Sequence, residues 1–312
     1  MSFSTAVKNE ISRIIPENNC CKKAELSGLI RVGGAITIAS NMKMALELRT
    51  ENAAVARKFL TLSKGAYGIE TEMSVLRKNR LKKNNTYRIK ISDEDSVKKI
   101  LVDLGISDDG FFLNAGVSKE ILEDTCCKRA FIRGLFLGSG SITDPEFGYH
   151  LEIIFESEDI AEILVQLLES FELHGKVIMR KNNYIVYIKE SEQIVTFLSI
   201  IEAHNALFSY ENTRIQKGMR NQVNRLVNCE TANLNKSIDA SFRQLKNIEI
   251  IDQHMGLDKL PDNLKDIALL RIENPDTSLK ELGEMLNPPV GKSGINHRMR
   301  RIETIAKSFR KK

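Results

Sequence analysis

The sequence has no long apolar run. None of its segments approaches the roughly 18 consecutive apolar residues that a membrane-spanning helix needs. The N-terminal segment MSFSTAVKNE is polar and carries an acidic residue, so it lacks the apolar core of a signal peptide. These absences predict a cytoplasmic protein that does not act at a membrane.

The five cysteines have none of the C-x-x-C spacing that is typical of zinc and redox sites. Four of them form two adjacent doublets, Cys20–Cys21 and Cys126–Cys127, and Cys229 stands alone. Because neighbouring cysteines rarely pair with each other, we predict reduced thiols, as in other cytoplasmic proteins. We predict no catalytic residue, no metal ligand and no cofactor.

Positive charge is concentrated near the C-terminus. Residues 290–312 contain eight Lys or Arg and one Glu, and residues 214–247 contain seven Lys or Arg and two acids. The segment between them, 248–289, is acidic, with nine Asp or Glu against four basic residues. A nucleic-acid-binding module shows such segregation. A solvated basic tail would show it too.

Two segments of the chain are nearly the same. CCKKAELSGLIRVGGAIT (20–37) and CCKRAFIRGLFLGSGSIT (126–143) are identical at nine of 18 positions, at an offset of 106 residues, which indicates an internal duplication. In each copy apolar residues recur at helical spacing, and Gly28 and Gly134 occupy the same place. Small residues let two helices approach closely. We therefore expect the two repeated helices to pack on each other about a pseudo-twofold axis.

The segments that follow each repeated helix are also parallel. Each contains an alternating strand, an amphipathic helix, a hairpin with an Asn-Asn turn and a further helix. Each unit is therefore predicted as α-β-β-α-β-β-α, with repeats at about 20–107 and 126–203. The predicted fold class is α+β, with a duplicated body over residues 1–210.

The segments LSGLIRVGG (26–34) and IRGLFLGSG (132–140) resemble the LAGLIDADG motif of homing endonucleases. The resemblance implies two sheets laid along the DNA major groove. In that family the eighth motif position is an acid that binds the catalytic metal ions, whereas this chain has Gly33 and Ser139 there. Asp144 is a single acid beyond the second motif and does not restore the pair. A non-enzymatic protein is predicted, and an active LAGLIDADG endonuclease is the disfavoured alternative.

The C-terminal third predicts a basic helical linker (211–257) and an all-α domain (258–312) with a helix-turn-helix at about 277–310. A first helix follows Pro261. The second opens with a capping box, Ser278 to Glu281, and buries Leu279, Leu282, Met285 and Leu286. Two prolines in NPPVG break the chain before the third helix, which we expect Ser293 to cap.

The third helix is the predicted reader of double-stranded DNA. Asn and Arg can bond adenine and guanine bidentately, and a helix N-terminus suits a phosphate. His297 could contact a base or a phosphate, or it could be a solvated surface residue with no contact to DNA. The candidate DNA-binding residues are Ser278, Lys280, Lys292, Ser293, Gly294, Asn296, His297, Arg298, Arg300 and Arg301. Secondary contacts are predicted from the two hairpins, at Arg77, Lys78, Arg80, Lys82, Lys83, Arg180 and Lys181.

Nearly the whole chain resembles the WhiA family of sporulation and cell-division regulators. The resemblance rests on MSFSTAVKNE, on both repeated helices, on NRLVNCETAN (224–233) and on SLKELGEMLNPPVGKSGINHRMRRI (278–302). It implies sequence-specific DNA binding in transcription control, cell division and chromosome segregation, and hence association with the nucleoid. A second reading remains open, in which the N-terminal body docks RNA polymerase, a sigma factor or a division protein while the C-terminal module holds DNA.

Overall fold

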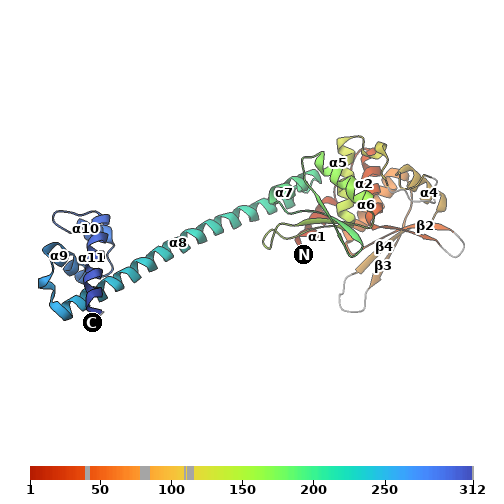
Figure 1. Ribbon diagram of the computed structural model, residues 1–312. Coiled ribbons are helices and arrows are strands. Elements are labelled where there is room, and N and C mark those ends of the chain that lie inside the picture. Colours follow the sequence, from red (N-terminus) through yellow and green to blue (C-terminus); the bar gives the residue numbers. More distant parts are fainter. Residues whose placement is uncertain (39–42, 78–84, 109, 111–115, 311–312) are drawn as a thin grey trace. The chain divides into compact units, whose positions relative to one another are not determined.

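The computed structural model describes residues 1–38, 43–77, 85–108, 110 and 116–310. The chain divides into unit 1, Met1–Lys217, and unit 2, Gly218–Lys312, which are described separately. Figure 1 labels many of their helices and strands. None of the described helices is long and apolar enough to cross a membrane.

Unit 1 opens with α1 (Phe3–Ile11) and then contains the predicted duplication. The first copy comprises α2 (Asn19–Gly33), β1 (Gly34–Ile38), β2 (Met44–Thr50), α3 (Ala53–Tyr67), β3 (Glu72–Arg77), β4 (Asn85–Ile91) and α4 (Glu94–Asp103). After the short η1 (Lys119–Leu122), the second comprises α5 (Thr125–Ser139), β5 (Gly140–Ile142), β6 (Leu151–Phe155), α6 (Glu158–Glu169), β7 (Lys176–Arg180), β8 (Asn183–Ile188) and α7 (Ser191–Ile200). The α-β-β-α-β-β-α order and the α+β class are confirmed.

Each copy contributes one antiparallel sheet, with strand orders β1-β2-β4-β3 and β5-β6-β8-β7. The second hairpin turns at Lys181 and Asn182, whose φ angles of 49° and 62° suit a two-residue turn. Asn183 already belongs to β8, so the predicted Asn-Asn turn is wrong by one residue. The turn of the first hairpin lies outside the described residues.

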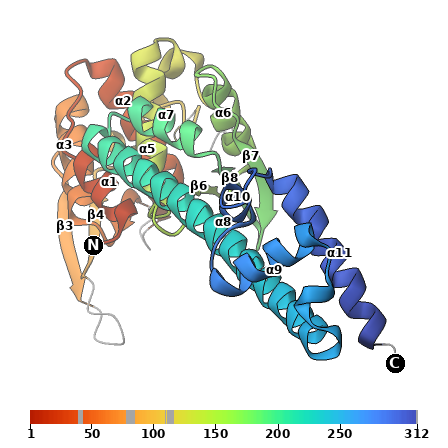
Figure 2. The same cartoon turned by 90° about the vertical axis from the view of Figure 1, so that its left-hand side faces the viewer.

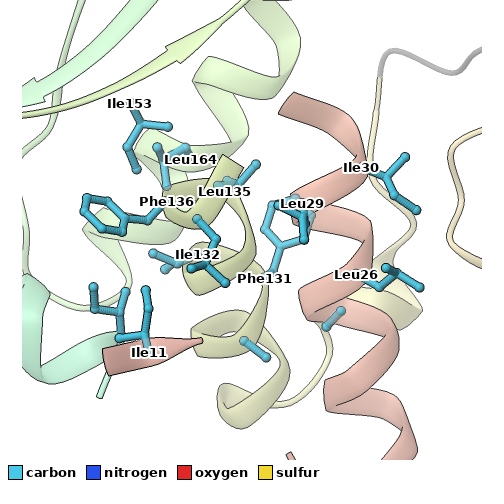
Figure 3. Close-up of a cluster of buried hydrophobic side chains, with 14 of the residues drawn as sticks. Ile11, Leu26, Leu29, Ile30, Phe131, Ile132, Leu135, Phe136, Ile153 and Leu164 are labelled. Atoms are coloured by element: carbon cyan, nitrogen blue, oxygen red, sulfur yellow. The ribbon is translucent and has the colours of Figure 1, made fainter. Parts of the chain in front are cut away.

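The repeated helices α2 and α5 pack directly on each other, as predicted, with their apolar side chains interleaved (Figure 3). A Cβ on Gly28 would lie 2.4 Å from the carbonyl oxygen of Phe131, and one on Gly134 would lie 2.1 Å from that of Glu25. No real Cβ approaches backbone so closely, so both positions require glycine. The duplicated glycines therefore set the distance between the two helices.

Charged side chains are buried beside this helix pair. Glu25 on α2 accepts from Lys58 on α3 (2.9 Å) and from Arg133 on α5 (3.2 Å), and all three side chains are almost fully buried. Arg133 also pairs with the half-exposed Glu202 at 2.7 Å. Lys58 donates in addition to the carbonyl of Ile14. Burial lowers the pKa of Lys58, although the charge of Glu25 opposes this effect. The network links α2, α3 and α5 through one carboxylate.

The predicted linker is part of a single long helix. Helix α8 (His204–Met255) begins in unit 1, where Tyr210 is fully buried, and ends in unit 2. Most side chains between 215 and 239 are exposed. Its C-terminal part is not a linker, because Ile248 and Ile251 are buried in the core of unit 2. Figure 2 shows the helices of unit 2 beside this part of α8.

Unit 2 continues with η2 (Leu257–Lys259), α9 (Asp262–Glu273), α10 (Leu279–Glu284) and α11 (Lys292–Arg310). The capping box at Ser278 and Glu281 is present, as predicted. Leu282 and Leu286 are buried, whereas Leu279 is only partly buried and Met285 is 52% exposed, so its predicted burial is wrong. Met285 is the C-cap of the short α10, and the following residue, Leu286, is the one that lies in the core.

The start of α11 also differs from the prediction. Its first intrahelical bond runs from the amide of Ile295 to the carbonyl of Gly291 (3.1 Å), so Gly291 occupies the cap position and the helix begins at Lys292. Ser293 therefore lies within the first turn and is not the cap. Lys292, expected before the helix, is its first residue.

Candidate nucleic-acid interface

The connection between α10 and α11 is held by a close backbone contact. The amide of Val290 donates to the carbonyl of Gly283 at 2.9 Å. A Cβ on Gly283 would lie 1.9 Å from the carbonyl oxygen of Val290. Only glycine fits there, so this residue fixes how closely the turn folds back onto α10.

The loop that leads into α10 is fixed by a buried arginine. Arg271 is 2% exposed, and its guanidinium donates to the carbonyls of Asn274, Pro275 and Thr277. Ser241 on α8 donates to the carbonyl of Pro275 as well. Since three carbonyls accept from one side chain, the loop has little freedom. The N-terminus of α10 is thereby positioned against α8 and α9.

Helix α11 has one apolar face and one polar face. Ile295, Met299, Ile302 and Ala306 are buried. At 100° per residue, His297 and Thr304 lie directly opposite this stripe, and Arg300 and Arg301 lie on either side of them. All four side chains are exposed. Asn296 is also exposed and lies about a quarter turn around the helix from the buried stripe.

Asn296 and Arg300 line a groove between α11 and the C-terminal part of α8. Its other charged or amide residues are Arg243, Gln244, Lys246, Asn247, Glu303 and Arg310. Arg310 donates to the side-chain oxygen of Asn247 at 3.0 Å, which ties the two helices together at one end. Four cations against one carboxylate make the groove basic. The basic composition of 214–247 was the only sequence signal for Arg243 and Lys246, which the candidate list omitted.

The other candidates in unit 2 are in several places. Ser293 is exposed. The side-chain oxygen of Ser278 accepts a hydrogen bond from the backbone amide of Glu281. Lys280 lies 3.8 Å from Glu284 on the exposed side of α10. Arg298 donates to the carbonyl of Asn263 on α9 (3.3 Å), and Gly294 lies against the side chain of Val290. Ser278, Arg298 and Gly294 therefore have structural roles in this fold.

The hairpin candidates can be placed only in part. Arg77 ends β3, opposite Asn85 of β4. Lys78, Arg80, Lys82 and Lys83 lie outside the described residues. Arg180 and Lys181, at the tip of the second hairpin, are exposed.

The two sheets differ on the faces that point away from the core. In the first sheet Arg49, Arg88 and Ser74 are cross-strand neighbours in one row. Both arginines pair with the buried Glu47. In the second sheet the corresponding row is Ile154, Ile185 and Ile178. Ile154 is 37% exposed and Ile178 is 45% exposed, whereas Ile185 between them is buried. The duplicated fold thus presents one charged row and one apolar row.

The eighth motif positions are the last residues of the two central helices, Gly33 in α2 and Ser139 in α5. Neither has a carboxylate. A Cβ on Gly33 would lie 3.0 Å from Leu48, and the hydroxyl of Ser139 has no hydrogen-bond partner among the described residues. Asp144 accepts the amide of Glu146 in the turn after β5. Within the described ranges, the groups of three or more potential metal ligands all involve the cysteine doublets.

Comparison with known proteins agrees with this architecture. Residues 19–107 match the WhiA N-terminal LAGLIDADG-like domain, residues 128–220 the WhiA LAGLIDADG-like domain, and residues 223–306 the WhiA C-terminal HTH domain. The chain is 50% identical to the probable cell division protein WhiA of Desulforamulus reducens, with 99% of this chain and 97% of that protein covered. It is 51% identical to the protein of the same name from Clostridium botulinum strain Hall, with 98% of both covered.

A solved structure shows the same fold over the full length. The full-length DUF199/WhiA protein from Thermatoga maritima aligns with a TM-score of 0.61 and 27% identity, covering 99% of each chain. The predicted LAGLIDADG-like body and helix-turn-helix domain are thus both confirmed. With three matching domains and relatives of about 50% identity along its length, the chain belongs to the WhiA family.

Proposed function

We propose that this protein is a non-enzymatic, sequence-specific DNA-binding protein that reads double-stranded DNA with α11. The observation that carries the proposal is the basic groove and outward face that α11 forms with α8. Cations from two helices, Arg243 and Lys246 on α8 and Arg300 and Arg301 on α11, lie around the polar residues Asn296 and His297. Such an arrangement supplies phosphate contacts on both sides of a base-reading surface.

Within α11, we expect different residues to contact the bases and the phosphate backbone. Asn296 and Arg300 are four residues apart and can enter one major groove, whereas Lys292, at the first position of the helix, meets the backbone. We expect Asn296→Ala or Arg300→Ala to cost about 1 to 3 kcal/mol on the target and to relax preference at one base pair. Lys292→Ala should weaken binding to all sequences equally and flatten the salt slope by about one unit.

The measurement is a titration of each variant against a target and a scrambled duplex at several salt concentrations. Lys259→Ala, an exposed lysine in η2, is the matched control and should change neither affinity. If Asn296→Ala and Arg300→Ala leave the ratio of target to scrambled affinity unchanged, α11 is not the reader. The basic hairpin at 77–88 would then become the candidate.

We further infer a role in transcription control during cell division, chromosome segregation or sporulation, in association with the nucleoid. Two relatives of this chain carry the name probable cell division protein WhiA, which supports a division role. A docking role of unit 1 toward RNA polymerase, a sigma factor or a division protein is the second candidate. The apolar row Ile154, Ile185 and Ile178 favours it, because a surface that holds the DNA backbone needs basic residues for the phosphates, and this row contains none.

DNA cleavage is not expected. Metal-dependent cleavage needs carboxylates that hold the ions at the attacking and leaving oxygens, and Gly33 and Ser139 supply none. Pure protein incubated with magnesium and supercoiled plasmid should therefore leave the plasmid intact, as followed on an agarose gel. A commercial endonuclease in the same buffer provides the positive control. Reproducible nicking that stops on chelation would contradict this expectation.

A further inference from the structure

The two cysteine doublets meet at the N-terminal ends of the central helices. Cys20 and Cys21 lie in the first turn of α2, and Cys126 and Cys127 lie in the first turn of α5. The sulfur of Cys21 lies 3.9 Å from that of Cys127. The thiols of Cys20, Cys21 and Cys127 all lie within 4.8 Å of one another, and the thiol of Cys126 lies within the same distance of that of Cys127 and of a carboxylate oxygen of Asp124. Residues separated by 106 positions thus form one thiol cluster.

The spacing of the sulfurs fits a shared cation better than a disulfide. A disulfide bond is about 2.05 Å long, so the 3.9 Å separation of Cys21 and Cys127 is that of two free thiols. In a tetrahedral zinc site with Zn–S bonds of about 2.3 Å, two sulfurs lie about 3.8 Å apart. The observed separation is close to one edge of such a tetrahedron.

The surroundings of the cluster suit thiolates. The cap residues Asn18 and Asp124 make no side-chain capping bond, and the amides of a first helical turn have no intrahelical acceptor. Those amides and the positive ends of two helix dipoles can stabilise negative sulfur. Lys22, Lys23, Lys128 and Arg129 directly follow the doublets and can offset the charge of a tetrathiolate site.

Zinc binds sulfur as the thiolate, so metal binding at this cluster would release thiol protons to solvent. Cys20 and Cys126 are exposed, so an ion has access to the cluster from solvent.

We propose that Cys20, Cys21, Cys126 and Cys127 hold one zinc ion that joins the N-terminal ends of α2 and α5. Sulfur ligands in a tetrahedral arrangement select zinc over magnesium or calcium. The ion would bind at the end of the helix pair opposite Gly33 and Ser139. The ion would have a structural role, which is to fix the two repeats against each other, and it would take no part in DNA cleavage.

The test is the metal content of the full chain, expressed without a polyhistidine tag and purified under reducing conditions. We expect about one zinc per chain by elemental mass spectrometry, the stoichiometry of a single structural site. Cobalt added to the apo-protein should give the visible bands of tetrahedral Co²⁺ and a near-ultraviolet thiolate-to-cobalt band. Cys127→Ser should lose the metal, whereas Cys229→Ser, which changes the lone exposed cysteine of α8, should keep it.

Two results would overturn the proposal. One is a wild-type chain that retains no zinc and gives no tetrahedral cobalt bands. The other is a disulfide between the doublets, found by mass spectrometry of alkylated, unreduced peptides, in a metal-free chain. Because Cys127 is buried, its variant is checked for folding by circular dichroism. If that variant does not fold, Cys20→Ser and Cys126→Ser, at exposed positions, should each weaken cobalt binding and lower the charge-transfer band.

Discussion

A chain that ends at Leu257 should bind its target duplex about a thousandfold or more weakly than the full chain, which is the usual gap between specific and non-specific binding. The truncation removes α9, α10 and α11, and with them Lys292, Arg300 and Arg301. Among the residues that the structure describes, the core of unit 1 extends no further than Tyr210, so its packing does not depend on the deleted part. Fluorescence anisotropy with a labelled duplex measures the loss at a fixed salt concentration.

The salt dependence of binding shows whether the lost affinity comes from phosphate contacts. Each phosphate contact contributes a log-log slope of about −0.9 on duplex DNA, so the truncated chain should show a flatter slope. Ile178→Glu in the second sheet is the matched control in unit 1, and it should leave DNA affinity unchanged if the apolar row serves another partner. Equal affinity of the truncated and full chains would move the DNA surface to the row of Arg49 and Arg88.

Replacing Glu25 by Ala should lower the free energy of unfolding of unit 1 by about 3 to 5 kcal/mol, the usual cost of removing one partner of a buried ion pair. Glu25 is the carboxylate shared by Lys58 and Arg133. Without it, two buried cations face each other, and only Arg133 keeps an acidic partner, Glu202. Burial already lowers the pKa of Lys58, so this lysine would lose its proton more readily in the variant.

Unit 1 can be followed by itself. All six tyrosines lie within residues 67–210 and the chain has no tryptophan, so tyrosine fluorescence in urea reports the unfolding of unit 1. The control is Glu94→Ala, which removes a partly exposed pair with Lys98 (2.8 Å) and should cost about 0.5 kcal/mol. A loss in the Glu25 variant no larger than that of the control would show that the network is not important for stability.

The elements and their order follow from patterns in the amino-acid sequence. The small residues at Gly28 and Gly134, the capping box at Ser278 and the apolar stripe of α11 are local patterns, and each depends on residues a few positions apart. The repeat at an offset of 106 is found by comparing the chain with itself. Helix and strand periodicity follow from backbone geometry, so such patterns can be read before the chain is folded. The loss of both motif acids is equally visible in the sequence.

The tertiary structure was needed to show which distant side chains share a surface. It brings the two cysteine doublets together and places Arg243 and Lys246 of the expected linker beside Asn296 and Arg300. It also shows that the outer faces of the two equivalent sheets differ, with a charged row on the first and an apolar row on the second. It also moved the start of α11 to Lys292, because the cap is set by the carbonyl of Gly291 and not by the nearest serine. Each of these depends on how separate elements pack, and packing is fixed by contacts between residues far apart in the chain, which no local pattern records.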